Sequence, residues 1–532
     1  MGCATCHLGD PQSDDKAKAH RGMTRDAGDL AVVTKTCGKS GCHPGEHERV
    51  ADSLMTTARG IVAVDRWAWG EAELPTGATT IQQVLTLPPH SDADRHLSKL
   101  CAGCHMGASR SNRDDVLQGQ GVGCAACHTA VRGEKVQPGH PSLDSRPDDR
   151  RCQGCHSRSS RISLTYQGLY EPAAWAKCPE PVALPDGRTL CQAEADVHQT
   201  AGLACIDCHG YSDVMGRNRS EQREFQAVDV RCESCHGPVP RAEQTTWPSV
   251  LPEPLSHLAG LRAHPRQPGA PARLGKLGAL LWNIVPAGPG NPAQLLRKAS
   301  GEPWDIKPTP VNLDHRRPGH ERLSCQACHS AMAPTCPTCH TGQNAAKEQW
   351  DFAAGRPTQG QFVEAGELQG LLPPALGMGP DGRILPAIPG MLAQLKRADG
   401  RSVALHLFAT LDPHSTRKIS RTCSDCHRQP RALGLGQGQL DVDLQPAKFT
   451  PFIALPADPS RATDGWTTLT DPQPGHSSQP GARSLNSLEL QKITRVGRCL
   501  TCHDAREDVL FGEFAPALRQ LQQPGNRCRG AL

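Results

Sequence analysis

The feature that most constrains this chain is a five-residue motif, Cys-x-x-Cys-His, which occurs ten times along its 532 residues. Histidine accounts for only 24 of those residues, so its presence directly after all ten cysteine pairs cannot be chance. The ten pairs are Cys3/Cys6, Cys101/Cys104, Cys124/Cys127, Cys152/Cys155, Cys205/Cys208, Cys232/Cys235, Cys325/Cys328, Cys336/Cys339, Cys423/Cys426 and Cys499/Cys502. The histidines that follow them are His7, His105, His128, His156, His209, His236, His329, His340, His427 and His503.

Three kinds of chemistry use a Cys-x-x-Cys pair, and the adjacent histidine decides among them. Zinc ribbons need two facing knuckles and do not require a histidine after each pair. Redox motifs of the thioredoxin type need a βαβ frame, and none is visible around these pairs. Attachment of c-type haem uses all three residues, because the thiols bond to the porphyrin and the histidine binds the iron. The ten motifs therefore predict ten covalently attached haems.

The stretch KTCGKSGCHPG, residues 35–45, contains a further cysteine pair with wider spacing. Its Gly-Lys-Ser suggests a phosphate-binding loop, but Val33 occupies the position of the required first glycine. Cys37, Cys42 and His43 are instead similar to a known variant of the haem motif with four intervening residues. The alternative for this pair is a disulfide or two thiols. We expect an eleventh haem here, so the predicted cofactor is haem c in eleven covalent copies.

Thirteen histidines lie outside these eleven motifs, close to the number needed to fill the sixth position of each iron. Several precede a motif by only a few residues, too close to bind the opposite face of their own haem, so we expect them to bind a neighbouring one. His90 and His257 are less favoured, because each stands near a second histidine. The favoured iron ligands are His20, His47, His96, His140, His198, His264, His315, His320, His406, His414 and His476.

Composition explains why such a chain needs its cofactors. Hydrophobic residues make up 37% of it and aromatic residues 4%, whereas glycine and proline contribute 52 and 46 residues. Such a chain buries too little apolar surface to offset the entropy lost on ordering, so haems must supply much of the interior. We expect a mostly irregular fold with short α-helices and a few short β-hairpins, organised around a chain of stacked c-type haems.

Local patterns place the regular elements and the larger segments. Short helices are predicted over residues 97–107, 292–300 and 391–398, and strands over 383–388 and 401–411. Residues 237–324, rich in proline, glycine and arginine, are expected to wrap haem edges irregularly. Motif spacing suggests four segments: 1–100 with two haems, 101–236 with five, 237–427 with three, and 428–532 with one.

Three cysteines remain after the haem motifs are removed: Cys178, Cys191 and Cys528. The stretch CPEPVALPDGRTLC, residues 178–191, reads as two short strands around a Pro-Asp-Gly turn. Cysteines at both ends of this hairpin predict a disulfide, worth on the order of 3 kcal/mol in the chain-entropy view. Cys528 has no evident partner.

The motifs from Cys3 to His503 resemble those of multihaem c-type cytochromes. Residues 198–210 and 231–238 are similar in local style to pentahaem nitrite reductases, hydroxylamine oxidoreductases and octahaem tetrathionate reductases. Those enzymes depend on a haem with a lysine-ligated motif or a tyrosine crosslink. This chain has no Cys-x-x-Cys-Lys, and its three tyrosines show no pattern that points to a crosslink. We therefore expect an electron carrier with no catalytic residues, and a multihaem oxidoreductase is the alternative.

Charge and hydropathy bear on partners and location. The polypeptide is formally +4, but the haem propionates would make the loaded protein negative, and the arginines suit propionate pairing. Nothing supports nucleic-acid binding. No window of about 18 apolar residues exists that could form a transmembrane helix.

Export is expected because c-type haem is attached outside the cytoplasm. We expect a leader upstream of the numbered chain and an extracellular or cell-surface location, with the periplasm as the alternative. The expected partners are other cytochromes or redox proteins and extracellular acceptors. Haem motifs near both ends of the chain also favour self-assembly into filaments.

Overall fold

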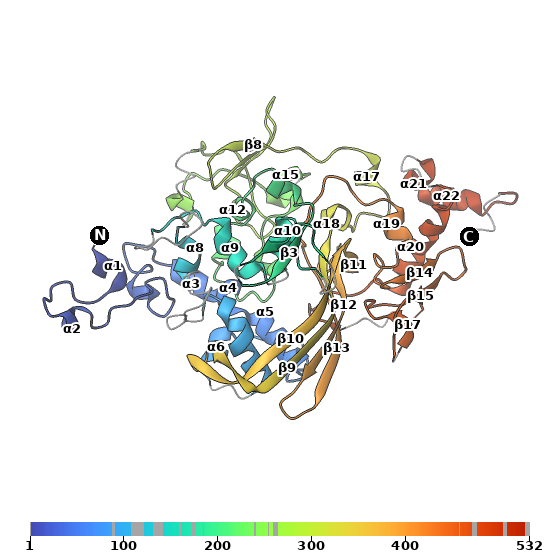
Figure 1. Cartoon of the computed structure of the whole chain (residues 1–532). Helices are drawn as coiled ribbons and strands as arrows, with labels where there is room; N and C mark the ends of the chain where they lie inside the picture. The colour runs from blue at the N-terminus through green and yellow to red at the C-terminus, as the bar shows by residue number, and fades with distance from the viewer. Residues whose placement is uncertain are drawn as a thin grey trace. The chain divides into compact units, whose positions relative to one another are not determined.

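The computed structural model describes two compact units, each built from separate stretches of the chain (Figure 1). The first unit comprises Met1–Arg158, Gly202–Thr309 and Gln343–Phe362, and the second comprises Ser159–Ala201, Pro310–Gly342 and Val363–Leu532. The described residues are 2–87, 91–107, 122–130, 142–158, 161–172, 177–184, 186–238, 241–253, 255–258, 264–456, 458–470, 476–503 and 508–526.

The N-terminal part of the first unit consists of short helices around a small apolar core. α5 begins after Ala58 and buries Val62, while α6 begins with a capping box between Thr80 and Gln83. The core cluster contains Ala58, Val62, Ile81, Val84, Leu97 and Ala102. The helices of this part are α1 (Cys3–His7), α2 (Lys16–Ala19), η1 (Val33–Lys35), α3 (Glu46–Asp52), α4 (Leu54–Thr57), α5 (Arg59–Ala68), α6 (Ile81–Thr86), α7 (Asp92–His96), η2 (Leu97–Cys101) and η3 (Ala102–Cys104). The helix predicted over 97–107 is thus helical only to Cys104, in π and 3-10 turns.

Among the further helices of this unit, four contain all or part of a cysteine motif: α8 (Cys124–His128), α9 (Asp149–His156), α12 (Cys205–Cys208) and α15 (Cys232–His236). α13 (Tyr211–Val214) comes just after a motif, and α14 (Glu224–Ala227) lies between two motifs.

The tract 237–324 is more regular than the sequence indicates. Its strands and 3-10 turns are η5 (Arg241–Glu243), β4 (Gln244–Thr246), η6 (Leu255–His257), β5 (Pro271–Arg273), β6 (Ile284–Val285), β7 (Gln294–Leu296) and β8 (Pro303–Asp305). Trp247, Leu255, Ala272, Leu280 and Trp282 form a buried cluster among them. The helix predicted over 292–300 is wrong: β7 is the central strand between β6 and β8, and pairing on both edges outweighs local helix propensity.

The largest sheet has the strand order β10-β9-β12-β13-β18, with β11 paired to β12. Its strands are β9 (Ala333–Asp351), β10 (Arg356–Leu372), β11 (Ala375–Met378), β12 (Ile384–Lys396), β13 (Ser402–Thr410) and β18 (His476–Ser477). The strands predicted over 383–388 and 401–411 are confirmed. The helix predicted over 391–398 is wrong, because residues to Lys396 continue β12 and pair with β13, Leu392 opposite His406.

Glycine permits close packing behind this sheet. Phe408 of β13 packs against Trp466 in a core cluster with Ala387 and Ala482. Gly434 has a φ of +81°, and a Cβ there would overlap Nε1 of Trp466. A larger residue at this position would displace the indole.

The C-terminal part of the second unit joins one long helix to two hairpins. α20 starts with a capping box between Asn486 and Glu489 and buries Leu490 in a cluster with Leu433 and Leu435. The remaining elements of this unit are α10 (Ile162–Tyr166), α11 (Val197–Thr200), α17 (Leu313–Arg316), α18 (Cys325–His329), α19 (Ser424–His427), β14 (Gly438–Asp441), β15 (Lys448–Pro451), β16 (Ala454–Leu455), β17 (Asp458–Ala462), α20 (Ser487–Cys499), α21 (Val509–Gly512) and α22 (Phe514–Leu521).

The predicted hairpin and its disulfide are confirmed. β1 (Leu169–Tyr170), β3 (Thr189–Gln192) and β2 (Val182–Ala183) form an antiparallel sheet with β3 in the centre. Cys178 and Cys191 are disulfide-bonded, with their Cα atoms 5.2 Å apart.

The fold class is mixed. Among the residues that the structure describes, roughly 29% are helix and 21% strand, so about half of them are irregular. The short helices and short hairpins agree with expectation, but the long strands β9, β10 and β12 do not. Among the described residues, no helix is both long and apolar enough to cross a bilayer.

Candidate functional site

Most cysteine motifs fold as a single helical turn. α1, α8, α15 and α18 each run from the first cysteine to the histidine, and α9 and α19 also end on the motif histidine. Residues three apart lie on the same face of a helix, so each turn presents both cysteines of its pair to one side. A helical turn at these motifs was not predicted from the sequence, although two cysteines three residues apart are consistent with one.

The second cysteines of two such turns, Cys155 and Cys328, are held through their backbone. Both residues are half-buried, Cys155 in α9 and Cys328 in α18. The carbonyl oxygen of Cys155 accepts from Arg158 N at 3.1 Å, and that of Cys328 accepts from Arg421 N at 3.0 Å. The structure brings neither thiol into a group of described side chains that could hold a metal ion. Thioether bonding of Cys155 and Cys328 to a porphyrin therefore stays a prediction from the motif spacing.

One motif departs from this pattern. Residues 336–340 lie within strand β9, where Thr338 pairs with Leu392 and His340 with Gln394 of β12. Positions three apart alternate between the two faces of a strand, so this backbone differs from a helical motif turn. Of Cys336 and Cys339, only the backbone belongs to the described structure.

Several motif histidines form a hydrogen bond through Nδ1. Five of them use Nδ1 to bind a backbone carbonyl oxygen: His7 to Thr24 at 2.9 Å, His128 to Asp144 at 2.9 Å, His236 to Lys307 at 2.6 Å, His329 to Arg417 at 3.1 Å and His427 to Ile493 at 2.9 Å. A carbonyl can only accept, so Nδ1 must carry the proton. Nε2 is then unprotonated and is the ring nitrogen able to bind a metal.

Two motif histidines use a carboxylate instead. His209 Nδ1 lies 2.8 Å from Oδ2 of Asp213, and His503 Nδ1 lies 2.8 Å from Oδ2 of Asp508. Both aspartates were missed from sequence. Their signal was weak, a carboxylate four or five residues after the motif histidine.

Several histidines outside the motifs are held in the same way. Their Nδ1 atoms lie 2.7 to 3.0 Å from acceptors: His20 with Lys16 O, His96 with Asp65, His198 with Asp196, His315 with Asn312 and His414 with Asp412 O. His47 differs, since its Nε2 lies 3.1 Å from Glu48 and its Nδ1 is buried. His96 is 7% exposed and contacts the rings of Trp69 and Phe362.

Two pairs of histidines face each other within the second unit. The ring centroids of His315 and His329 are 6.3 Å apart with an interplanar angle of 12°, and those of His320 and His427 are 6.0 Å apart at 43°. A metal–imidazole bond is about 2 Å and the ring centroid lies about 1 Å beyond the nitrogen, so two imidazoles on opposite faces of one metal have centroids about 6 Å apart. Each pair joins a motif histidine to a histidine that we expected as a second ligand.

Burial keeps one of these pairs uncharged. Burial, reinforced by His427 and Arg317, lowers the pKa of His320 to about 4. Burial also lowers the pKa of His427. Both imidazoles are therefore neutral near pH 7, which is the protonation state of a metal ligand.

Within the first unit, cysteines of different motifs lie in contact. Hydrogen bonding to Cys124 lowers the pKa of Cys37 to about 6, and the same bond raises the pKa of Cys124. Cys152 and Cys205 form a second such thiol contact, which raises the pKa of Cys205. Lys39 donates to the carbonyl oxygen of Thr5 at 3.1 Å, which links the first two motifs.

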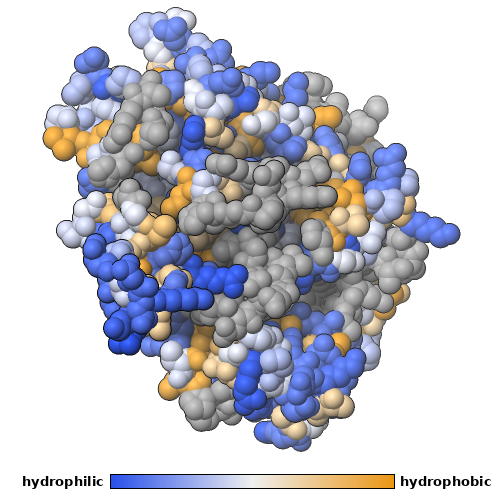
Figure 2. All heavy atoms as spheres, turned by 60° about the vertical axis from the view of Figure 1, so that its left-hand side comes forward, coloured by the Kyte–Doolittle hydropathy of each residue, from blue (hydrophilic) through white to orange (hydrophobic). Residues whose placement is uncertain are grey.

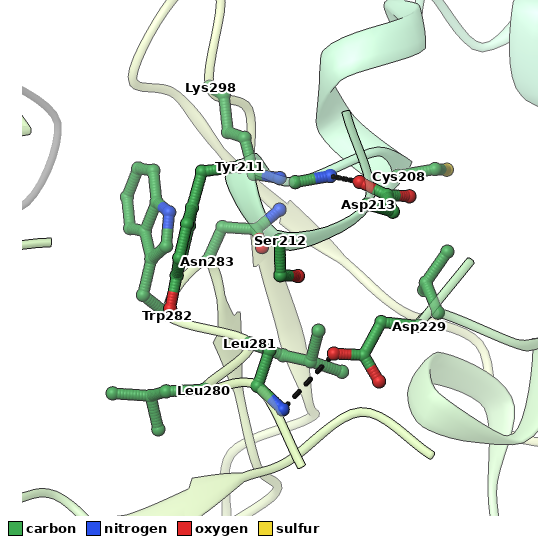
Figure 3. A pocket seen from close by; sticks show the side chains of 13 residues that line it. Cys208, Tyr211, Ser212, Asp213, Asp229, Leu280, Leu281, Trp282, Asn283 and Lys298 are labelled. Carbon is green, nitrogen blue, oxygen red and sulfur yellow. Dashed lines mark hydrogen bonds between the residues drawn. The ribbon is translucent and has the colours of Figure 1, made fainter. Parts of the chain in front are cut away.

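A small pocket adjoins the motif that ends at His209 (Figure 3). Cys208, Tyr211, Asp213, Asp229 and Lys298 are among its lining residues. Burial lowers the pKa of Lys298 and raises that of Asp229. Burial would lower the pKa of His209, but the hydrogen bond to Asp213 and the negative charge of that carboxylate together outweigh burial, so the pKa is raised.

The remaining predicted residues are placed without an assigned role. His264 and His406 are half-buried, whereas His43, His340 and His476 are exposed. His90, His140 and Cys528 lie outside the described residues, and of His257 only the backbone is described. Among the side chains that the structure describes, no group of three or more histidine, cysteine, aspartate or glutamate residues could hold a metal ion by itself.

Comparison with known proteins does not assign this chain to a family. No protein-family model matches the chain, and neither the curated proteins nor the solved structures include a significant match.

Proposed function

We propose that this protein transfers electrons along eleven covalently attached c-type haems, most of them ligated by histidine on both faces. Each cysteine pair would form the two thioether bonds, and the adjacent histidine would bind the iron through Nε2. When bound, the haem supplies a one-electron redox centre. The chain's own residues fix the imidazole tautomer, hold the porphyrin edges and exclude water.

The facing histidines carry this proposal. His315 with His329 and His320 with His427 have the centroid separation expected of two ligands on one iron. Nδ1 of His315, His329 and His427 is engaged by Asn312 or by backbone carbonyls, so Nε2 remains as their metal-binding nitrogen. An iron with two protein ligands has no position left for a substrate, and this favours electron transfer over catalysis.

Exposure of the outer motifs supports exchange of electrons with a partner. Cys3, Cys6 and Cys502 are exposed, whereas the inner-motif cysteines whose side chains the structure describes are half-buried. A porphyrin edge at such a position can be approached by another redox protein, an extracellular acceptor or a second copy of this chain. We propose an extracellular or cell-surface location, with filament assembly as one form of that contact.

The test combines haem counting with replacement of one second ligand. The purified protein should have the mass of eleven haems and a low-spin spectrum. His315→Ala should convert one haem to high spin, because it opens the sixth position of the His329 iron. Arg316→Ala is the matched control, since Arg316 is exposed on the same helix.

Contrary results are easily recognised. Absence of covalent haem would overturn the proposal, and a mass of ten haems with Cys37 open to alkylation would overturn the variant motif. High-spin wild-type protein that rapidly reduces nitrite or oxidises hydroxylamine would replace electron transfer by the enzymatic alternative.

A further inference from the structure

Two charged side chains, Asp213 and Lys298, form hydrogen bonds with the motif histidine His209. Its Nδ1 lies 2.8 Å from Oδ2 of Asp213, while Oδ1 of the same carboxylate accepts from Gly210 N at 2.7 Å. The Asp213 side chain is only 3% exposed. The carboxylate is thus fixed by two donors and screened from water, and its charge acts on the imidazole at close range.

Lys298 brings a positive charge to the same place. Its Nζ donates to the carbonyl oxygen of His209 at 3.2 Å, and its backbone N–H donates to Oδ1 of Asp207 at 2.5 Å. Asn283 donates to the carbonyl oxygen of Asp207 at 2.9 Å. Lys298, between β7 and β8, and Asn283, next to β6, therefore hold helix α12 from outside the motif, and Lys298 and Asp213 line one pocket (Figure 3).

We propose that Asp213 and Lys298 set the reduction potential of the haem held by Cys205, Cys208 and His209, with effects of opposite sign. This inference rests on the proposed function. A carboxylate bonded to Nδ1 makes the imidazole a stronger electron donor and favours oxidised iron. A nearby ammonium group favours reduced iron, because reduction adds a negative charge. Asp213 lowers the potential, and Lys298 limits that effect.

The chain contains a matched comparison for the carboxylate. His503 and Asp508 have the same 2.8 Å contact, and the two histidines are similarly exposed, but the Asp508 side chain is 28% exposed against 3% for Asp213. Water screens that pair, so its influence on the iron is weaker than that of Asp213. Histidines bonded to carbonyls, such as His7 and His128, have no negative charge at Nδ1.

The experiment is a spectroelectrochemical titration of the complete haem-loaded protein and four variants. Asp213→Asn should move one haem's share of the absorbance change to a more positive potential, and Lys298→Met should move it to a more negative one. Asp213→Glu, which retains the carboxylate, should remain closer to wild type. Asp508→Asn should give a positive shift smaller than that of Asp213→Asn.

The outcomes separate this inference from the proposed function. Intact mass first establishes that each variant carries its full complement of haems; a wild type without haem ends the proposed function and this inference with it. Full haem loading with shifts of the same sign, or with no shift in Asp213→Asn, overturns the inference alone. If Asp213→Asn fails to retain its haem, Lys298→Met decides: a shift to a more negative potential supports the inference, and no shift or a positive shift overturns it.

Discussion

At the scale of single residues, the motif histidines are characterised by hydrogen bonding at Nδ1. Nδ1 of His7, His128 and His236 binds a carbonyl oxygen contributed by another part of the chain. This bond fixes both the tautomer and the ring plane before any iron is bound. Preorganised side chains of this kind lose little entropy on binding a metal, which would suit the proposed attachment of many haems.

Away from the motifs, Glu171 forms ion pairs with two arginines. Its carboxylate binds Arg161 and lies 2.8 Å from Nη1 of Arg188, with 10% of its side chain exposed. Burial alone would raise the pKa of Glu171, but the two guanidinium groups outweigh burial and hold it below the usual 4.5. Ionised Glu171 therefore stabilises the fold above about pH 4.5.

Replacing Glu171 by glutamine should lower the free energy of unfolding by about 2 kcal/mol at pH 7, because Arg161 and Arg188, which are 30% and 20% exposed, lose a shared carboxylate, although Arg188 keeps Asp186. The folded pKa is depressed, so the difference from wild type should shrink as the pH falls below 4.5. Chemical denaturation of both proteins between pH 3 and pH 8 measures this. Glu180→Gln, an exposed site in the neighbouring hairpin, is the control; a difference independent of pH would contradict the prediction.

At the scale of elements, a disulfide or pairing with neighbouring strands stabilises segments of the fold. The β2–β3 hairpin is closed by Cys178–Cys191 across a separation of 13 residues, and Cys191 is 3% exposed on the central strand. β7 and β12 show the same principle, since strand pairing on both sides overrides a local helical pattern.

Changing both Cys178 and Cys191 to serine should destabilise this hairpin by about 3 kcal/mol, because the open chain regains the entropy that the crosslink removes. Faster hydrogen exchange over residues 178–192 should report the loss. Glu180→Ala, in the same loop and exposed, should leave exchange unchanged. Equal protection in the serine variant would mean that packing of β3 alone holds the strand.

At the scale of the whole molecule, composition limits how much of the interior the polypeptide can supply. The apolar clusters are small, such as the one that Trp466 forms with Ala387, Phe408 and Ala482, and only 37% of residues are hydrophobic. The surface mixes polar and apolar groups: the face in Figure 2 is largely hydrophilic with scattered apolar residues. The cofactors are therefore expected to complete the core.

Protein produced without haem attachment should accordingly fail to become compact. We expect it to elute at a larger hydrodynamic radius than the loaded protein and to be cleaved by protease at many sites. Size-exclusion chromatography of the two forms, followed by limited proteolysis, measures this. A protease-resistant, compact apoprotein would show that the small clusters suffice.

Spacing along the chain is enough to predict features that lie within a few residues. The ten motifs with an adjacent histidine, the variant at Cys37 and the Cys178–Cys191 hairpin are of this kind, because local geometry decides them. Which histidines face each other follows from the fold: His320 and His427 are more than one hundred residues apart. The placement of Lys298 beside His209 is of the same kind, because a hydrogen bond forms between neighbours in space that sequence order does not specify.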